Sequence, residues 1–95
     1  MLTSATSKDL VGEAVLIHEL LEPFVAEDGT RYLVRTWGQS RSDGTWIGWI
    51  TFVTPNGLVT RRTPRETTQS SREHLNYWAH GLEPSYIEGA FTRAE

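Results

Sequence analysis

The chain has 95 residues, a formal net charge of −3 and no cysteine. This length fits one domain, and the absence of cysteine excludes disulfides, thiolate metal sites and cysteine nucleophiles. Hydrophobic residues make up 38% of the sequence and aromatic residues 11%, which is more apolar material than a disordered chain carries. We therefore expect residues 1–95 to form a single folded domain.

The expected location is the cytoplasm. The first residues contain no basic segment followed by an apolar run, as a secretory signal would. The longest mostly apolar stretch, at 14–21, is far shorter than the roughly 20 residues that a membrane span requires. We expect no interaction with a membrane.

Residues 1–22 are expected to form an N-terminal helical extension. Apolar residues recur at helical spacing at Leu10, Ala14, Ile17 and Leu21. This spacing predicts a helix over 8–21 that ends before Pro23. Gly12 weakens a helix, and the run Val15-Leu16-Ile17 also suits a strand, so a strand remains the alternative.

Residues 23–64 change to a β pattern. Runs rich in β-branched and aromatic residues occupy 24–26, 32–37, 46–53 and 58–60. Asp-Gly or Asn-Gly pairs separate these runs, and such pairs favour tight hairpins in which both central residues take a positive φ. The pattern predicts a four-stranded antiparallel β-meander.

Residues 70–94 are expected to form a pair of short helices. Ser70-Ser71-Arg72-Glu73 matches a capping box, and Gly81 suits a left-handed cap, so the first helix is expected at 71–80. Pro84 suits the first position of a second helix at 84–94. The residues expected in the core, against one face of the sheet, are Leu75, Trp78, Ile87 and Phe91. The predicted fold class is α+β: a four-stranded meander followed by two helices, with a helix before it.

Three motifs resemble those of a family of small bacterial proteins of unknown function. They are D-G-T-W-x-G-W at 43–49, R-E-T-T-Q at 65–69 and Y-W-A-x-G-L at 77–82. The resemblance covers residues 23–94 and implies one folded unit, with the first 22 residues added to it. The family carries no known activity, so the resemblance implies no chemistry.

Few residues suit catalysis or metal binding. His74 and His80 lie six residues apart, which places them on different faces of a helix, and no His-Glu-x-x-His motif is present. No serine has a Gly-x-Ser-x-Gly context. Glu66 could act as a catalytic acid, but a carboxylate between sheet and helix is more often a hydrogen-bond partner. We expect no catalytic residue, no metal and no cofactor, and we rank an enzyme third.

Charge is unevenly distributed along the chain. Residues 1–30 carry one lysine and six acidic residues, residues 31–72 carry seven arginines and two acidic residues, and residues 73–95 carry one arginine and four acidic residues. The basic part coincides with the predicted sheet. Either the acidic segments pair with these arginines within the chain, or a basic sheet face binds an acidic partner or a phosphate backbone.

Both faces of the predicted sheet carry aromatic side chains, although two short helices can cover only one face. The candidate binding residues are Arg35, Trp37, Trp49, Arg61, Arg62 and Arg65. Exposed arginine and tryptophan are enriched at binding hot spots. We therefore expect a non-catalytic interaction module that binds a protein partner or a second copy of itself. The alternative is single-stranded nucleic-acid binding, with Trp37 or Trp49 stacking on bases, and the overall acidity argues against it.

Overall fold

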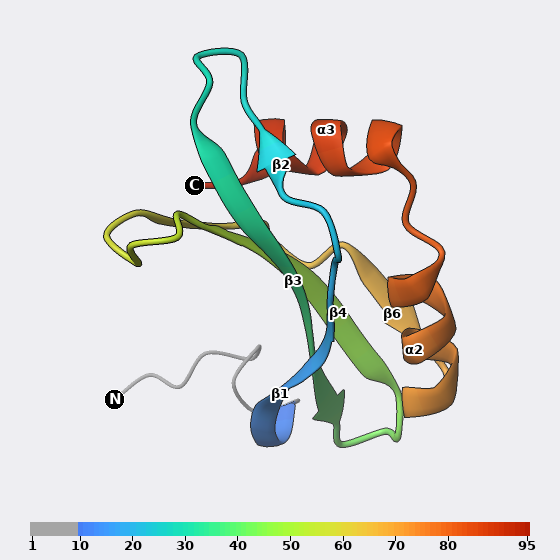
Figure 1. Ribbon diagram of the computed structural model, residues 1–95. Helices are drawn as coiled ribbons and strands as arrows, with labels where there is room; N and C mark the ends of the chain where they lie inside the picture. Colours follow the sequence, from blue (N-terminus) through green and yellow to red (C-terminus); the bar gives the residue numbers. More distant parts are fainter. Residues whose placement is uncertain (1–9) are drawn as a thin grey trace.

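The computed structural model describes residues 10–95. They form an antiparallel sheet of six strands followed by two helices, which is an α+β arrangement (Figure 1). The strands are β1 (Leu10–Glu19), β2 (Phe24–Val25), β3 (Arg31–Arg41), β4 (Trp46–Val53), β5 (Thr60–Arg62) and β6 (Thr67–Gln69). The helices are α2 (Arg72–His80) and α3 (Pro84–Arg93).

The centre of the sheet is the hairpin of β3 and β4. These strands pair from Leu33 opposite Val53 to Ser40 opposite Trp46. β1 and β2 follow one another along the free side of β3, and β5 and β6 do the same along β4. Each edge of the sheet thus consists of two strands, one after the other. The predicted antiparallel sheet with two C-terminal helices is confirmed, but the expected count of four strands is wrong, because β1 and β6 extend the two edges.

The expected N-terminal helix is wrong over residues 10–19, which form β1, and its first two residues lie outside the described part of the chain. The pairing with β3 shifts register between Val11 and Val15 and again between Leu16 and His18. Each shift interrupts the two-residue alternation of a strand. The apolar residues of β1 consequently recur at intervals that imitate a helix.

The three hairpin turns share one geometry. Gly29, Gly44 and Gly57 have φ values of +88°, +89° and +76°, and no other residue type in the described part takes a positive φ. The expectation that both central turn residues have positive φ is therefore wrong. In the first turn the Gly29 N–H donates to the Ala26 carbonyl at 2.9 Å, and the Asp28 carboxylate accepts the Thr30 N–H. A turn with glycine only at its last position needs one left-handed residue instead of two.

The helix boundaries agree with the sequence prediction to within a residue. α2 begins after Ser71, whose hydroxyl accepts the N–H of His74 at 3.1 Å, and α3 begins with Pro84. Gly81 ends α2 with a φ of −98°, so the predicted left-handed cap is wrong. Within residues 10–95, no helix combines the length and the apolar character that crossing a bilayer would demand.

Both helices pack on one face of the sheet. Leu75 of α2 is fully buried above the cross-strand pair Gly38 and Gly48. Without side chains, these two glycines leave room for the leucine against the backbone. The second part of the core joins α3 to β3 and β4 through Tyr32, Val34, Ile50, Phe52, Ile87 and Ala90. Of the four residues expected in the core, Leu75 and Ile87 are buried, whereas Trp78 and Phe91 are partly buried at its rim.

Candidate functional site: the sheet face without helices

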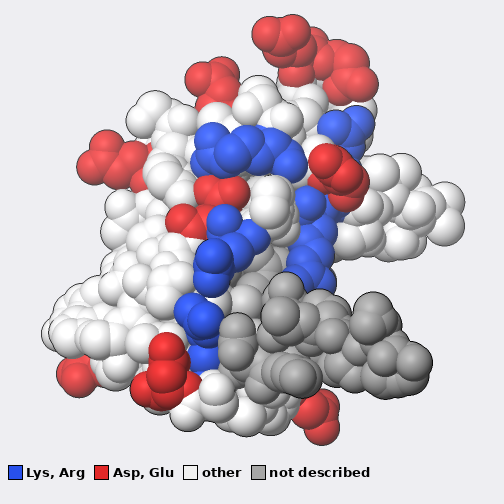
Figure 2. All heavy atoms as spheres, turned by 180° about the vertical axis from the view of Figure 1, so that it is seen from behind, with Lys and Arg blue, Asp and Glu red and all other residues white. Residues whose placement is uncertain are grey.

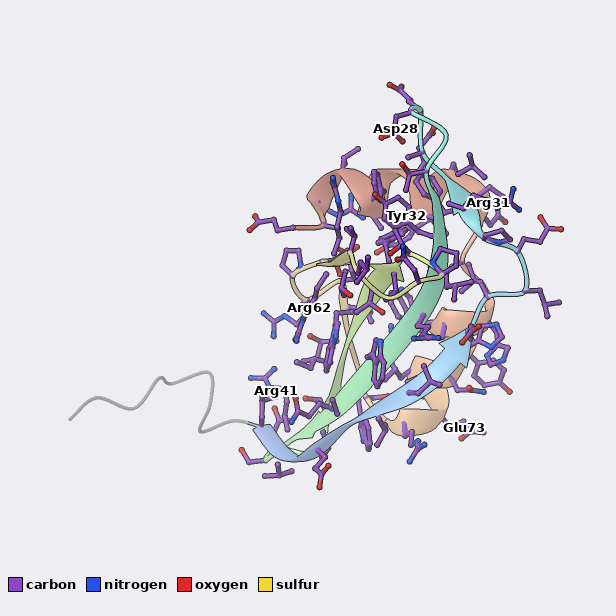
Figure 3. All side chains as sticks on the ribbon, turned by 60° about the vertical axis from the view of Figure 1, so that its left-hand side comes forward. Asp28, Arg31, Tyr32, Arg41, Arg62 and Glu73 are labelled. Atoms are coloured by element: carbon purple, nitrogen blue, oxygen red, sulfur yellow. The ribbon has the colours of Figure 1, made fainter. Side chains whose placement is uncertain are left out.

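The face of the sheet opposite α2 and α3 is covered by neither helix, and we call it the helix-free face. The residues facing the helices alternate along β3 with Arg35 and Trp37, which therefore point the other way. On β4 the same holds for Trp49 and Thr51. Figure 3 shows Arg62 projecting from the side of the sheet that lies away from α2.

Strand register brings aromatic and basic side chains together on this face. Arg35, Thr51 and Arg62 lie opposite one another in one row, and Trp37 and Trp49 face each other in the next. The Trp37 indole N–H donates to the Thr51 hydroxyl at 2.9 Å, which ties the ring to the sheet. The Arg62 guanidinium lies 4.3 Å from the centre of the Trp49 ring. The result is an indole pair bordered by arginines.

The arginines of the helix-free face differ in how their charges are balanced. Arg35 Nε donates to Glu19 Oε1 at 2.9 Å, so an acidic side chain of β1 forms an ion pair with Arg35. Arg62 is exposed, and it forms no ion pair with any residue from 10 to 95. β1 lies in the plane of the sheet and does not cover it. Pairing of an acidic residue with an arginine within the chain, one of the two alternatives from the sequence, is therefore seen at Glu19 and Arg35, while β1 itself pairs beside β3.

Seen from behind in Figure 2, Arg side chains gather in a band down the molecule, and acidic side chains lie mainly around it. The structure brings Arg35, Trp37, Trp49 and Arg62 together, but not all of the candidate residues. Arg61 points to the opposite face, where its guanidinium lies 4.9 Å from the centre of the Phe91 ring. Arg65 is exposed in the link between β5 and β6. The placement of Arg61 follows from strand alternation, which separates it from its neighbour Arg62.

Leu16 is a member of this face that the sequence interpretation missed. It lies opposite Trp37 in the pairing of β1 with β3, and 46% of its surface is exposed. The helical interpretation of residues 8–21 hid this neighbour. The signal that could have found it is the run Val15-Leu16-Ile17, whose branched side chains favour a strand.

The contacts of Glu66, the one residue considered as a catalytic acid, are those of a residue that stabilises the fold. Its side chain is 4% exposed, and its carboxylate accepts hydrogen bonds from the Tyr86 hydroxyl at 2.7 Å and from two nitrogens of Arg93 at 2.7 and 3.1 Å. Burial alone would raise the pKa of this carboxyl, but the hydrogen bonds and charge of Arg93 and the bond from Tyr86 outweigh it, so the pKa lies below its usual range. The group is ionised at neutral pH and suits holding α3 better than donating a proton.

His18 of β1 and His80 of α2 stack, with their ring centres 3.9 Å apart. Burial, and then the charge of His80, lower the pKa of His18, so the stack favours the neutral form of His18. Among the described residues, no three histidine or acidic side chains gather in a way that could hold a metal ion.

The helix-free face presents the Trp37 indole, the Leu16 side chain and the Arg62 guanidinium, which forms no ion pair in the described part of the chain. These groups bind through apolar contact and charge, and none of them is a nucleophile or a general base at neutral pH. A scan against protein-family models, a search of curated proteins and a search of solved structures each returned no match to this chain.

Proposed function

We propose that this chain is a non-catalytic protein-interaction module that binds an acidic, apolar segment of a partner protein on its helix-free face. The observation that carries the proposal is the partly exposed Trp37 beside Arg62, which lies over the buried Trp49 and has no ion pair within residues 10–95, on a face that neither α2 nor α3 covers. Binding hot spots typically combine a well-packed aromatic centre with arginine. Leu16, at the rim of this face, adds exposed apolar surface.

Charge favours an acidic partner over a second copy of the same face. A guanidinium without a carboxylate partner offers forked hydrogen bonds to an incoming Asp or Glu. Two copies joined through this face would instead bring basic side chains towards each other, and like charges in contact disfavour association. Self-association is therefore an alternative outcome of the test.

Single-stranded nucleic acid is less compatible with the same geometry. Base stacking needs an open aromatic ring, but Trp49 is only 4% exposed and the guanidinium of Arg62 already lies over it. Trp37 is partly buried and its N–H is bonded to Thr51. An apolar peptide side chain needs only the exposed edge of Trp37 and the neighbouring Leu16, and so fits this face better than a row of bases.

The test uses a labelled decapeptide of alternating leucine and glutamate, titrated by fluorescence anisotropy and mapped by amide chemical shifts. We expect saturable binding with shift changes at residues 33–39, 47–51 and 60–62. Arg62→Glu should weaken binding about tenfold or more, because it replaces attraction by repulsion. Arg61→Glu is the matched control, since it changes the net charge equally on the opposite face, and it should change the affinity less than about twofold.

Several results would contradict the proposal. Equal effects of the two charge reversals would show attraction to net charge alone. Binding of a dodecamer of thymidine, with steep loss of affinity in salt and no binding of the acidic peptide, would indicate nucleic acid. A dimer that Arg62→Glu converts to a monomer would identify a second copy as the occupant.

A further inference from the structure

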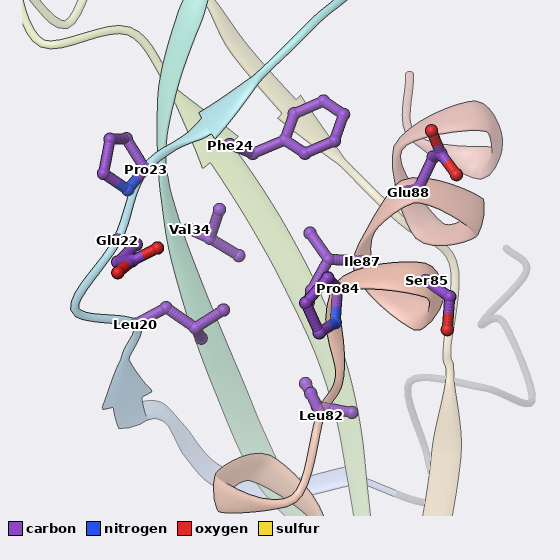
Figure 4. A pocket seen from close by; sticks show the side chains of 10 residues that line it. All are labelled: Leu20, Glu22, Pro23, Phe24, Val34, Leu82, Pro84, Ser85, Ile87 and Glu88. Carbon is purple, nitrogen blue, oxygen red and sulfur yellow. The ribbon is translucent and has the colours of Figure 1, made fainter.

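We propose that a groove between the β1–β2 link and α3 binds a basic, apolar peptide segment. This site is separate from the helix-free face and would take a partner of the opposite charge. Its first hollow has a volume of about 490 Å³. Figure 4 shows it between the chain that leads into β2 and the start of α3. The lining residues on which the argument depends are Leu20, Phe24, Val34, Leu82 and Ile87.

The first hollow has an apolar interior. Val34 of β3 and Ile87 of α3 are buried members of the core, and Leu20, Phe24 and Leu82 are partly buried against it. In Figure 4 these side chains point into the space between the two walls. An apolar hollow open at the edge of the sheet can accept an aliphatic or aromatic side chain from another chain.

A second hollow, of about 510 Å³, adjoins the first and has Phe24 and Glu88 in common with it. Its lining continues along β2 and α3 through Val25, Tyr32 and Phe91. Two hollows side by side suit an extended peptide, whose alternate side chains enter one hollow each. A single compact ligand would fill only one of them.

The charged residues that line the groove indicate which charge a bound peptide must carry. The charged residues that line the first hollow are Glu22 and Glu88, and both are exposed acids. The second hollow adds Glu27 and Asp28 against one cation, Arg61, which lies over the Phe91 ring. The groove is therefore acidic, and complementarity calls for lysine or arginine beside the apolar side chains.

Exposed apolar side chains at the same edge favour a peptide over a small molecule. Leu21, in the link beside the first hollow, is 98% exposed. Val25, which lines the second hollow, is 51% exposed. Such side chains next to an apolar groove mark a macromolecular contact, because a ligand inside the groove would leave them in water.

The test uses the full chain and three labelled decapeptides: alternating leucine and lysine, alternating leucine and glutamate, and alternating serine and lysine. We expect the leucine–lysine peptide to shift the amide signals of residues 20–26 and 82–92. The serine–lysine peptide has the charge without the apolar side chains, and the leucine–glutamate peptide has the opposite charge. Neither should shift these signals.

Two isosteric variants probe the rim of the groove. Glu22→Gln and Glu88→Gln should each weaken binding of the leucine–lysine peptide about two- to fivefold, the range expected for exposed ion pairs. Glu73→Gln is the matched control, because Glu73 is an exposed acid of α2 that lines neither hollow. It should leave the affinity unchanged, and Arg62→Glu should not weaken the binding either.

The proposal is overturned if the serine–lysine peptide binds equally well, if Glu73→Gln weakens binding as much as Glu88→Gln, or if the shifted signals map to the helix-free face. It is also overturned if the free protein is a dimer that Glu22→Gln with Glu88→Gln converts to a monomer, because the occupant is then a second copy. Failure here leaves the proposed function untouched, since that function is measured with the acidic peptide and Arg62→Glu.

Discussion

At the scale of single residues, Glu66 joins parts of the chain that are far apart in sequence. Its N–H donates to the Gly48 carbonyl of β4 at 2.8 Å, and its carboxylate holds Tyr86 and Arg93 of α3. A buried carboxylate in its charged form is stable only when it is hydrogen-bonded and paired with a cation. The protonation of this one group is consequently coupled to the docking of a helix.

Because the protonation of Glu66 is coupled to the docking of α3, we expect Glu66 to contribute to the unfolding of the protein in acid. The pKa of Glu66 in the folded chain is below its ordinary value of 4.5, so its stabilisation is present above that value and is lost as the pH falls through the lowered pKa. Glu66→Gln should lower the free energy of unfolding at pH 7 by about 1–3 kcal/mol and flatten its decline below pH 4.5. Urea denaturation followed by tryptophan fluorescence at several pH values measures both effects.

The lowered pKa values of two aspartates do not affect the comparison between the parent protein and Glu66→Gln. Hydrogen bonds from Thr30 and from Thr45 lower the pKa values of Asp28 and Asp43, and both groups remain in the parent and the variant. The difference between the two proteins therefore isolates Glu66. If the free energy of unfolding of Glu66→Gln declines in acid as steeply as that of the parent, the assignment is contradicted. Glu73→Gln is the control and is expected to behave like the parent.

At the scale of elements, the contact of α2 with the sheet depends on a lock between one leucine and two glycines. A Cβ atom on Gly48 would come within 2.7 Å of Leu75 Cδ1, and one on Gly38 would overlap the same side chain more severely. At such distances the fully buried Leu75 side chain, the helix or the strands must move. The close approach explains glycine in the middle of both central strands, where it otherwise weakens a sheet.

A double-mutant cycle tests this lock. Gly38→Ala should lower the free energy of unfolding by about 1–3 kcal/mol through overpacking, and Leu75→Ala by about 2–5 kcal/mol through an unfilled cavity. Combined, they should cost less than the sum, because alanine at 75 leaves room for the new methyl group. Gly81→Ala is the control, since its nearest neighbour would be 3.4 Å away and its φ is negative. Additive costs at 38 and 75 would disprove the contact.

The sequence predicted best the elements whose signals are local. Ser71 and Pro84 mark helix starts, and Gly44 and Gly57 mark turns, because caps and turns are decided by a few neighbouring residues. β1 was predicted wrongly, because its two register shifts depend on pairing with a strand about 20 residues away. The short strand β6 is likewise defined by its partner β4 and hardly by its own three residues.

At the scale of the whole molecule, a net charge of −3 conceals two surfaces of opposite character. The helix-free face is basic at Arg62, whereas the groove beside α3 is acidic at Glu22 and Glu88. The sequence indicated the first surface through alternation along β3 and β4. It could not indicate the second, whose residues come from the β1–β2 link, β3 and α3, and meet only once α3 has packed. With both sites, the module would join an acidic segment to a basic one.

The central place of the β3–β4 hairpin also has a consequence for the order of events in folding. Every other strand pairs with β3 or β4, and these two are joined by a turn of only a few residues, so closing their loop costs little entropy. We expect this hairpin to form in the transition state, and β1 and α3 to join after it. Stopped-flow kinetics should give Ile50→Val, in β4, a φ-value of about 0.5–0.8, and Ala90→Gly, in α3, a value of about 0–0.3. In that case, destabilising α3 would mainly shorten the lifetime of the folded state and barely delay its formation.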